Sequence, residues 1–184
     1  MSVGNGLSMN SRHQIRQGNV SSQPDPQPIT LPLSKLLTIE QCPTEWRRYN
    51  LYLFRDDTVT FYVGQSYTAF DRVWAHLFGG FKGRSVVGLF VLCNWPRSMR
   101  FVVELIDSQS TRFDPLGNDL DAAERYLIEQ LSPCFNEALN SQPTPLPGKY
   151  SPPSARGRRP KSIKRMMHDA ARACQLEHDR REWE

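Results

Sequence analysis

Apolar and polar positions alternate in blocks that predict a mixed α/β domain. The run YNLYLF, starting at Tyr49, is apolar and aromatic, as is typical of a buried strand. The polar stretch DDT separates it from VTFYVG, so the two runs predict an antiparallel hairpin that ends at Gly64. The later run RFVVELI predicts a third strand.

Two helices are predicted from apolar residues at helical spacing. In TAFDRVWAHLF, Phe70, Val73 and Leu77 recur on one face, and Ser66 or Thr68 provides an N-cap. Asp119 begins DLDAAERYLIEQL, an amphipathic helix whose first turn is acidic, as the helix dipole favours. The run RSVVGLFVLCNW fits either a strand or a short buried helix, and the pattern leaves both open.

These elements give an α/β domain with a small three-stranded antiparallel sheet flanked by helices. The chain divides into a disordered tail (1–30), a lead-in (31–48), the globular domain (49–140), a Pro-rich basic linker (141–160) and a basic amphipathic helix (161–184). Residues 1–30 are rich in Ser, Asn, Gln and Gly, which argues against a packed core in this N-terminal segment. Pro32 and Pro43 bracket any helix in the lead-in.

Charge is distributed unevenly along the chain. The net charge is +4, but residues 31–140 hold eleven Lys and Arg against thirteen Asp and Glu, which is −2. Residues 141–184 hold ten against five, which is +5. A basic tail on a mildly acidic domain predicts a polyanionic partner, bound by the tail and processed by the domain.

The four cysteines are far apart and form no CxxC pair, so we expect reduced thiols of a cytosolic protein, with neither a zinc site nor a disulfide framework. The first thirty residues lack the apolar region of a signal peptide, and no stretch is apolar enough for a membrane span. We therefore expect a cytoplasmic protein without a membrane partner, associated with the nucleoid in a bacterium or nuclear in a eukaryote.

Polar residues with catalytic potential recur at informative spacings. Arg72 follows Tyr62 by ten residues and His76 follows it by fourteen, so Arg72 and His76 share one face of the predicted helix. Glu124 and Asn136 are twelve apart, and a proline comes three residues before the asparagine. Singly, each has an ordinary explanation: packed tyrosines, an exposed helix face, a charge near a helix N-terminus or a turn.

Together with NLY (50–52) and YVG (62–64), this order and spacing resemble the GIY-YIG nuclease family over residues 49–140. The resemblance implies a three-stranded sheet with the catalytic site on one face. Asn50 stands where the family has its first glycine, a mainly conformational position that a hairpin with Asn accommodates.

For the substrate, the resemblance implies a phosphodiester that is hydrolysed with the help of a divalent metal. Glu124 is the expected metal ligand, because Mg²⁺ or Mn²⁺ prefers oxygen donors. Such a metal polarises the phosphate and stabilises the departing oxygen. Arg72 is expected to bind the non-bridging phosphate oxygens with its forked donors.

For proton transfer, the resemblance implies that Tyr52 takes the proton from water. Because a phenol is a weak base at its ordinary pKa, nearby cations must help it. His76 is expected to relay the proton or to hold a tyrosine, and Tyr62 to orient the water or the phosphate. Asn136 is expected to fix local structure near the site.

The basic tail contains ARGRRPK, which looks like an AT-hook with an extra arginine before its proline. General phosphate attraction and a nuclear-import-like run are the alternatives. The expected nucleic-acid contacts are Arg156, Arg158, Arg159, Lys161, Lys164 and Arg165. The apolar stripe of the last helix fits docking on the domain, a homodimer seam or folding on DNA.

The resemblance thus implies a metal-dependent DNA endonuclease, and the size best suits a compact nuclease of a phage or other mobile element, with DNA repair as another role found in the family. The alternatives are a non-catalytic DNA-binding protein on the same fold and a structural partner in a larger complex. The residues leave open whether the DNA is single- or double-stranded and whether RNA also serves.

Overall fold

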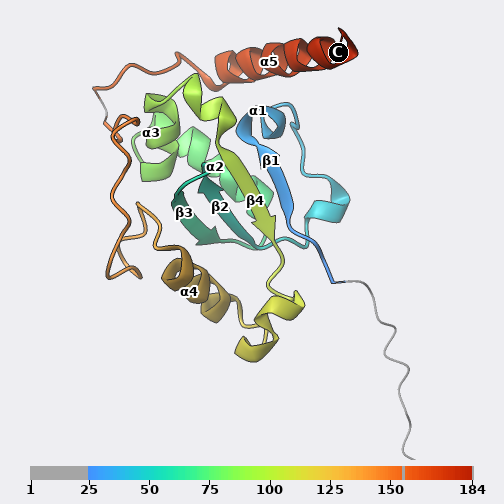
Figure 1. The fold of residues 1–184 in the computed structure, drawn as a ribbon, viewed down its shortest axis with the longest axis vertical. Coiled ribbons are helices and arrows are strands. Elements are labelled where there is room, and N and C mark those ends of the chain that lie inside the picture. Colours follow the sequence, from blue (N-terminus) through green and yellow to red (C-terminus); the bar gives the residue numbers. More distant parts are fainter. Residues whose placement is uncertain (1–24, 155, 184) are drawn as a thin grey trace, which may run out of the picture.

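The computed structural model of the chain describes residues 25–154 and 156–183. Most of the predicted disordered tail (1–30) lies outside the described residues. The described part is an α/β fold in which an antiparallel sheet is covered by helices (Figure 1).

The sheet has four strands, in the order β1-β4-β2-β3, and every neighbouring pair is antiparallel. Their bounds are β1 Ile29–Pro32, β2 Leu51–Arg55, β3 Thr60–Gln65 and β4 Val102–Ile106. The hairpin β2–β3 and the strand β4 confirm the predictions.

The prediction of three strands is wrong, because β1 adds a fourth. It pairs with β4 from Ile29 opposite Leu105 to Pro32 opposite Val102. The sequence predicts the end of the disordered tail (1–30) and the start of the lead-in (31–48) at this place, with Pro32 limiting any helix, and predicts no strand. Here β1 is an edge strand and Pro32 is its last residue, so the missing N–H costs little.

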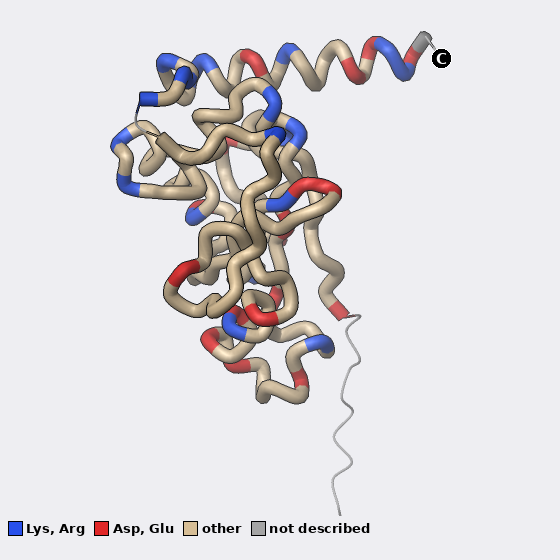
Figure 2. Tube along the Cα trace, turned by 60° about the vertical axis from the view of Figure 1, so that its left-hand side comes forward, with Lys and Arg blue, Asp and Glu red and all other residues tan. Residues whose placement is uncertain are grey.

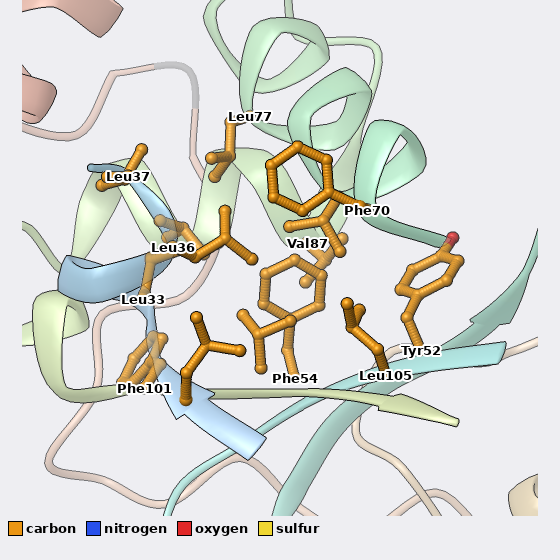
Figure 3. Close-up of a cluster of buried hydrophobic side chains, with 14 of the residues drawn as sticks. Leu33, Leu36, Leu37, Tyr52, Phe54, Phe70, Leu77, Val87, Phe101 and Leu105 are labelled. Carbon is orange, nitrogen blue, oxygen red and sulfur yellow. The ribbon is translucent and has the colours of Figure 1, made fainter. Parts of the chain in front are cut away.

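Helices cover both faces of the sheet (Figure 1). One face packs on α1 (Leu33–Leu36), α2 (Ala69–Phe81), α3 (Val86–Cys93) and the first half of α5 (Ile163–Trp183). The opposite face packs on α4 (Leu120–Leu131) and the 3₁₀ turn η3 (Thr111–Leu116). Two further 3₁₀ turns are η1 (Thr44–Trp46) and η2 (Arg97–Arg100). Figure 3 shows the larger core, where Tyr52, Phe54 and Leu105 rise from the sheet toward the helices.

The predicted helices α2 and α4 are present, and Asp119 caps α4 by accepting a hydrogen bond from the Ala122 amide at 2.8 Å. The ambiguous run is the helix α3. Its Gly88 faces α2, where a Cβ atom would lie 1.9 Å from the His76 carbonyl oxygen. The two helices therefore pack with their backbones in contact, which only glycine permits here.

The segment predicted as a linker lies along the domain, and we call its residues 141–154 the strap. The Tyr150 ring meets Phe61, Phe90 and Phe101 edge-on, with centroid separations of 5.3 to 5.8 Å. Asn94 exchanges two hydrogen bonds with the Ser151 backbone, at 2.8 and 2.9 Å. Several aromatic and polar contacts thus fix the strap on the core.

Helix α5 joins the body through its first half. Met166 and Ala170 are fully buried, and the Trp95 indole donates to Asp169 at 3.1 Å. The C-terminal end of the helix extends beyond the rest of the molecule (Figure 2), and Leu176 is exposed.

Candidate active site

The site begins with Tyr52, whose ring rises from β2 on the face that α2 covers (Figure 3). Its side chain is only 1% exposed. Gly64 lies opposite it on β3, and a Cβ there would be 2.4 Å from the Tyr52 hydroxyl and 2.9 Å from the Tyr62 ring. The glycine of the YVG run is therefore required to make room for both tyrosines.

Two more groups extend this arrangement. The Tyr52 hydroxyl lies 2.7 Å from Nε2 of His76 on α2, and the two share a hydrogen bond. On the other side of the imidazole, Nδ1 of His76 lies 2.8 Å from Oγ of Ser85, which caps α3 and accepts from the Gly88 amide at 3.0 Å. A continuous polar path thus runs from β2 through α2 to the start of α3.

Tyr62 and Arg72 complete the group on this side of the sheet. The Tyr62 ring lies 5.3 Å from the His76 ring and 6.1 Å from the Tyr52 ring, centroid to centroid. Arg72, exposed on α2 one turn before His76, is close enough to lower the pKa of Tyr52 and of Tyr62. An exposed cation thus lies next to two largely buried phenols.

Glu124 approaches from α4, on the other face of the sheet, and is half-buried. Nε2 of Gln65, the last residue of β3, donates to the Glu124 carboxylate at 3.1 Å and to Asp121 at 2.5 Å. The negative charge of Glu124 contributes to raising the pKa of Tyr62, after burial. The carboxylate and the tyrosines therefore interact around the end of β3.

Asn136 has a structural contact, as the sequence led us to expect. Its side chain accepts from the Val63 amide at 2.9 Å and donates to the Val63 carbonyl at 2.7 Å. The amides of Cys134 and Phe135 donate to the carbonyls of Thr60 and Phe61. This segment covers the outer edge of β3 up to Val63 and leaves the end at Gly64 and Gln65 to the catalytic candidates.

Burial sets the protonation states of the site. It raises the pKa of Tyr52 above its ordinary range, an effect that Arg72 opposes. Burial, and then the charge of Arg72, lower the pKa of His76 from 6.5 to about 4. At neutral pH the structure therefore holds a neutral imidazole against a neutral phenol.

The acidic side of the site fits a divalent metal in its chemistry. Mg²⁺ is commonly held by one or two carboxylates, with waters and substrate phosphates completing its shell. Glu124 and Asp121 offer such a pair, and the partly positive amide nitrogen of Gln65 lies between them. Within the described residues, no group of three or more His, Cys, Asp or Glu side chains could hold a metal ion.

The six basic residues predicted to contact nucleic acid are all exposed. Lys and Arg gather where α5 begins, whereas Asp and Glu are frequent around α4 (Figure 2). Gly157, within the AT-hook-like run, packs on Cys93 of α3, since a Cβ there would be 2.9 Å from the sulfur. Lys164 and Met167 of α5 line a groove with Asp71 and Trp74 of α2, beside Arg72 in the chain.

The sequence did not indicate three residues of this site: Gln65, Ser85 and Asp121. Gln65 and Ser85 each contact a predicted site residue on another element, and Asp121 contacts Gln65. The sequence spacing gave no sign of these tertiary contacts. The only local signal was that Ser85 precedes an apolar run, as an N-cap does.

In comparisons with known proteins, no family model, no curated protein and no solved structure matches the chain. No helix in the described part of the chain is long and apolar enough to cross a membrane.

Proposed function

We propose that this chain is a divalent-metal-dependent endonuclease that hydrolyses DNA phosphodiester bonds, as the resemblance to GIY-YIG nucleases implies. One observation carries the proposal. Tyr52, Tyr62, Arg72, His76 and Glu124, which come from β2, β3, α2 and α4, lie together around the end of the edge strand β3. Asn136, the sixth member of the pattern, fixes that strand.

The two charged groups suit a bound phosphodiester. Arg72 is exposed on the tyrosine side and is available to hold non-bridging oxygens. On the opposite side, Glu124, with Asp121 beside it, would hold Mg²⁺ or Mn²⁺. When bound, the metal supplies charge stabilisation for the phosphate and the leaving oxygen.

The proton path uses the hydrogen bond between Tyr52 and His76. Tyr52 takes a proton from the attacking water while its own proton passes to Nε2 of His76, which is neutral and able to accept it. The positive charge of Arg72 favours the phenolate that forms in passing. Tyr62, which interacts with both Tyr52 and Glu124, is placed to orient the water or the phosphate.

The basic segment just before α5 suits a second contact to the nucleic acid. Arg156, Arg158 and Arg159 are exposed and flank Gly157, which is anchored on α3. We propose that these side chains bind backbone phosphates and provide much of the affinity, while the near-neutral domain cuts.

The test is a cleavage panel on single-stranded, duplex, flap and cruciform DNA with Mg²⁺ or Mn²⁺, using wild type, Glu124→Gln and Glu124→Ala. Glu124→Gln should slow cleavage by more than ~100-fold, since removing the metal ligand forfeits several kcal/mol of transition-state stabilisation. Glu129→Gln, an exposed change on the same helix, is the matched control and should cut like wild type.

Stability distinguishes lost chemistry from lost structure. Burial raises the pKa of Glu124, so the folded state disfavours its ionised form, and Glu124→Gln should melt at or above the wild-type temperature. Cleavage by Glu124→Gln at the wild-type rate would refute the mechanism. DNA binding without cleavage of any substrate by wild type would favour the non-catalytic alternative.

A further inference from the structure

Ser85 lies at the buried end of the polar path and contacts neither Arg72 nor Glu124 in any hydrogen bond of the described structure. Its Oγ is 2.8 Å from Nδ1 of His76, and Nε2 on the opposite side of the ring is 2.7 Å from the Tyr52 hydroxyl. The imidazole is thus held at both nitrogens, and the proton it carries in its neutral form must sit on one of them.

The proposed proton path decides which nitrogen must carry the proton. For Nε2 of His76 to accept the proton of Tyr52 across their 2.7 Å contact, Nε2 must be the bare nitrogen of the neutral ring. Nδ1 then carries the proton and donates it to Ser85 Oγ, which also accepts from the Gly88 amide at 3.0 Å.

The close packing of α2 and α3 places this hydroxyl. A Cβ at Gly80 would lie 2.5 Å from the Gly88 backbone, and one at Gly79 would lie 3.1 Å from the Ser85 side chain. Bulkier residues would separate the helices and move Ser85 away from His76. The glycines and the N-cap therefore bring Ser85 to a fixed distance from the imidazole.

We infer that Ser85 is a positioning residue that fixes His76 in the tautomer protonated on Nδ1, so that Nε2 is free to accept the proton of Tyr52. This inference rests on the proposed nuclease function, but the tautomer of the ring is measured without any cleavage assay. Groups that orient a functional histidine through its second nitrogen affect activity without touching substrate.

The experiment reads the tautomer directly, from the ¹⁵N chemical shifts of the His76 ring at neutral pH. Wild type should show a protonated Nδ1 and a bare Nε2. Ser85→Ala and Ser85→Gly should show a mixture of the two tautomers. Glycine is a tolerated N-cap and alanine is a poor one, so a shared effect reports the missing hydroxyl and not helix capping.

Cleavage rates are measured on the same proteins. Both variants should lose on the order of tenfold in rate, with little change in the substrate concentration for half-maximal rate, because Ser85 does not contact the substrate. Ser85→Thr, which keeps the hydroxyl and the cap, should restore both the single tautomer and the rate.

Two results would overturn the inference: a wild-type proton on Nε2, or an unchanged single Nδ1–H tautomer in Ser85→Ala and Ser85→Gly. The groups facing His76 are Tyr52 and Phe54 from β2, Tyr62 from β3, Arg72 from α2 and Ser85 from α3. Because none of these is changed in the Ser85 variants except Ser85 itself, the shifts report on that contact. If wild type cuts no DNA, the proposed function fails, yet the ring shifts still decide the tautomer.

Discussion

His76 combines two conditions that work against its protonation. It is largely enclosed by Tyr52, Phe54 and Tyr62, and the guanidinium of Arg72 lies nearby. A base with this surrounding is useful in a relay because it stays neutral and accepts a proton only in passing. The same condition makes the folded state sensitive to acid.

We expect His76 to make the free energy of unfolding depend on pH. Its pKa is about 4 in the folded protein and 6.5 ordinarily, so the unfolded chain binds the proton first as the pH falls. The stability difference between wild type and His76→Gln should be constant above pH 6.5. Below pH 6.5 wild type should lose stability relative to His76→Gln, by up to roughly 3 kcal/mol of unfolding free energy near pH 4.

Urea denaturation of both proteins at several pH values measures this difference. Burial raises the pKa of Glu124, so Glu124 changes the stability with pH in the opposite direction to His76. Subtracting the two curves removes this contribution, because both proteins contain Glu124. Parallel curves for wild type and His76→Gln from pH 7 to 4 would contradict the burial of a neutral imidazole.

Among the elements, α2 and α3 cross so closely that there is no room for a side chain between them. Gly88 of α3 contacts the backbone of α2 at the carbonyl of His76, so the position of the catalytic candidate depends on a residue of the next helix. Small residues at such a crossing allow an approach that any side chain would prevent. Enlarging one of them therefore forces the backbone to move.

Gly88→Ala should destabilise the protein by at least ~2 kcal/mol, because its Cβ would lie 1.9 Å from a backbone oxygen that no side-chain rotation can relieve. Thermal and urea unfolding measure the change. Gly148→Ala is the matched control, since a Cβ there meets nothing within 4 Å, and it should unfold like wild type. Equal stability of the two variants would contradict the close crossing.

Elements with a clear period were predictable, and those defined by tertiary contact were not. The apolar, aromatic runs of β2 and β3 and the helical stripe of α2 appear directly in the order of residues. The strand β1 was missed because prolines surround it and its partner β4 is some seventy residues away in the chain. The run around Gly88 was ambiguous because α3 is apolar along its whole length and has no polar face to reveal its period.

The same distinction between sequence pattern and tertiary contact applies to the residues of the candidate site. Tyr52, Arg72, His76 and Glu124 came from a resemblance in order and spacing, and the structure brings them into one region. Ser85 carries no such signature, because its role depends on how two helices pack.

At the scale of the whole molecule, the strap limits how the predicted DNA binding by the basic tail (141–184) can be tested. Burial alone would raise the pKa of Asp56, but hydrogen bonds from Lys149 and Tyr150 of the strap and from the backbone amides of the turn hold this pKa well below its usual range. Deleting residues 149–184 would therefore remove the aromatic cover over Phe61 and Phe101 together with the basic residues. A loss of DNA binding would then be indistinguishable from a loss of structure.

Changing charge alone avoids that difficulty. Replacing Arg156, Arg158 and Arg159 with glutamine leaves the strap and Gly157 in place and should weaken DNA binding uniformly across sequences. The slope of log affinity against log salt should fall by up to about 3, one for each phosphate that an arginine no longer neutralises. Fluorescence anisotropy across a salt series measures it.

The control is a variant with Arg172, Arg180 and Arg181 changed to glutamine, which removes the same charge further along α5. A larger drop in the salt slope for the Arg156, Arg158 and Arg159 variant than for this control identifies the segment before α5 as the region that binds DNA. The same slope in wild type and the Arg156, Arg158 and Arg159 variant would remove these residues from the interface.

The amide of Asn136 has a consequence for how the protein behaves in concentrated solution. By bonding both backbone groups of Val63, it occupies the positions that a strand from a second molecule would need, and the backbone of Cys134 and Phe135 occupies the positions before it. At the far edge, β1 is short and ends in a proline. Both rims of the sheet therefore resist the strand-to-strand association that leads to aggregation.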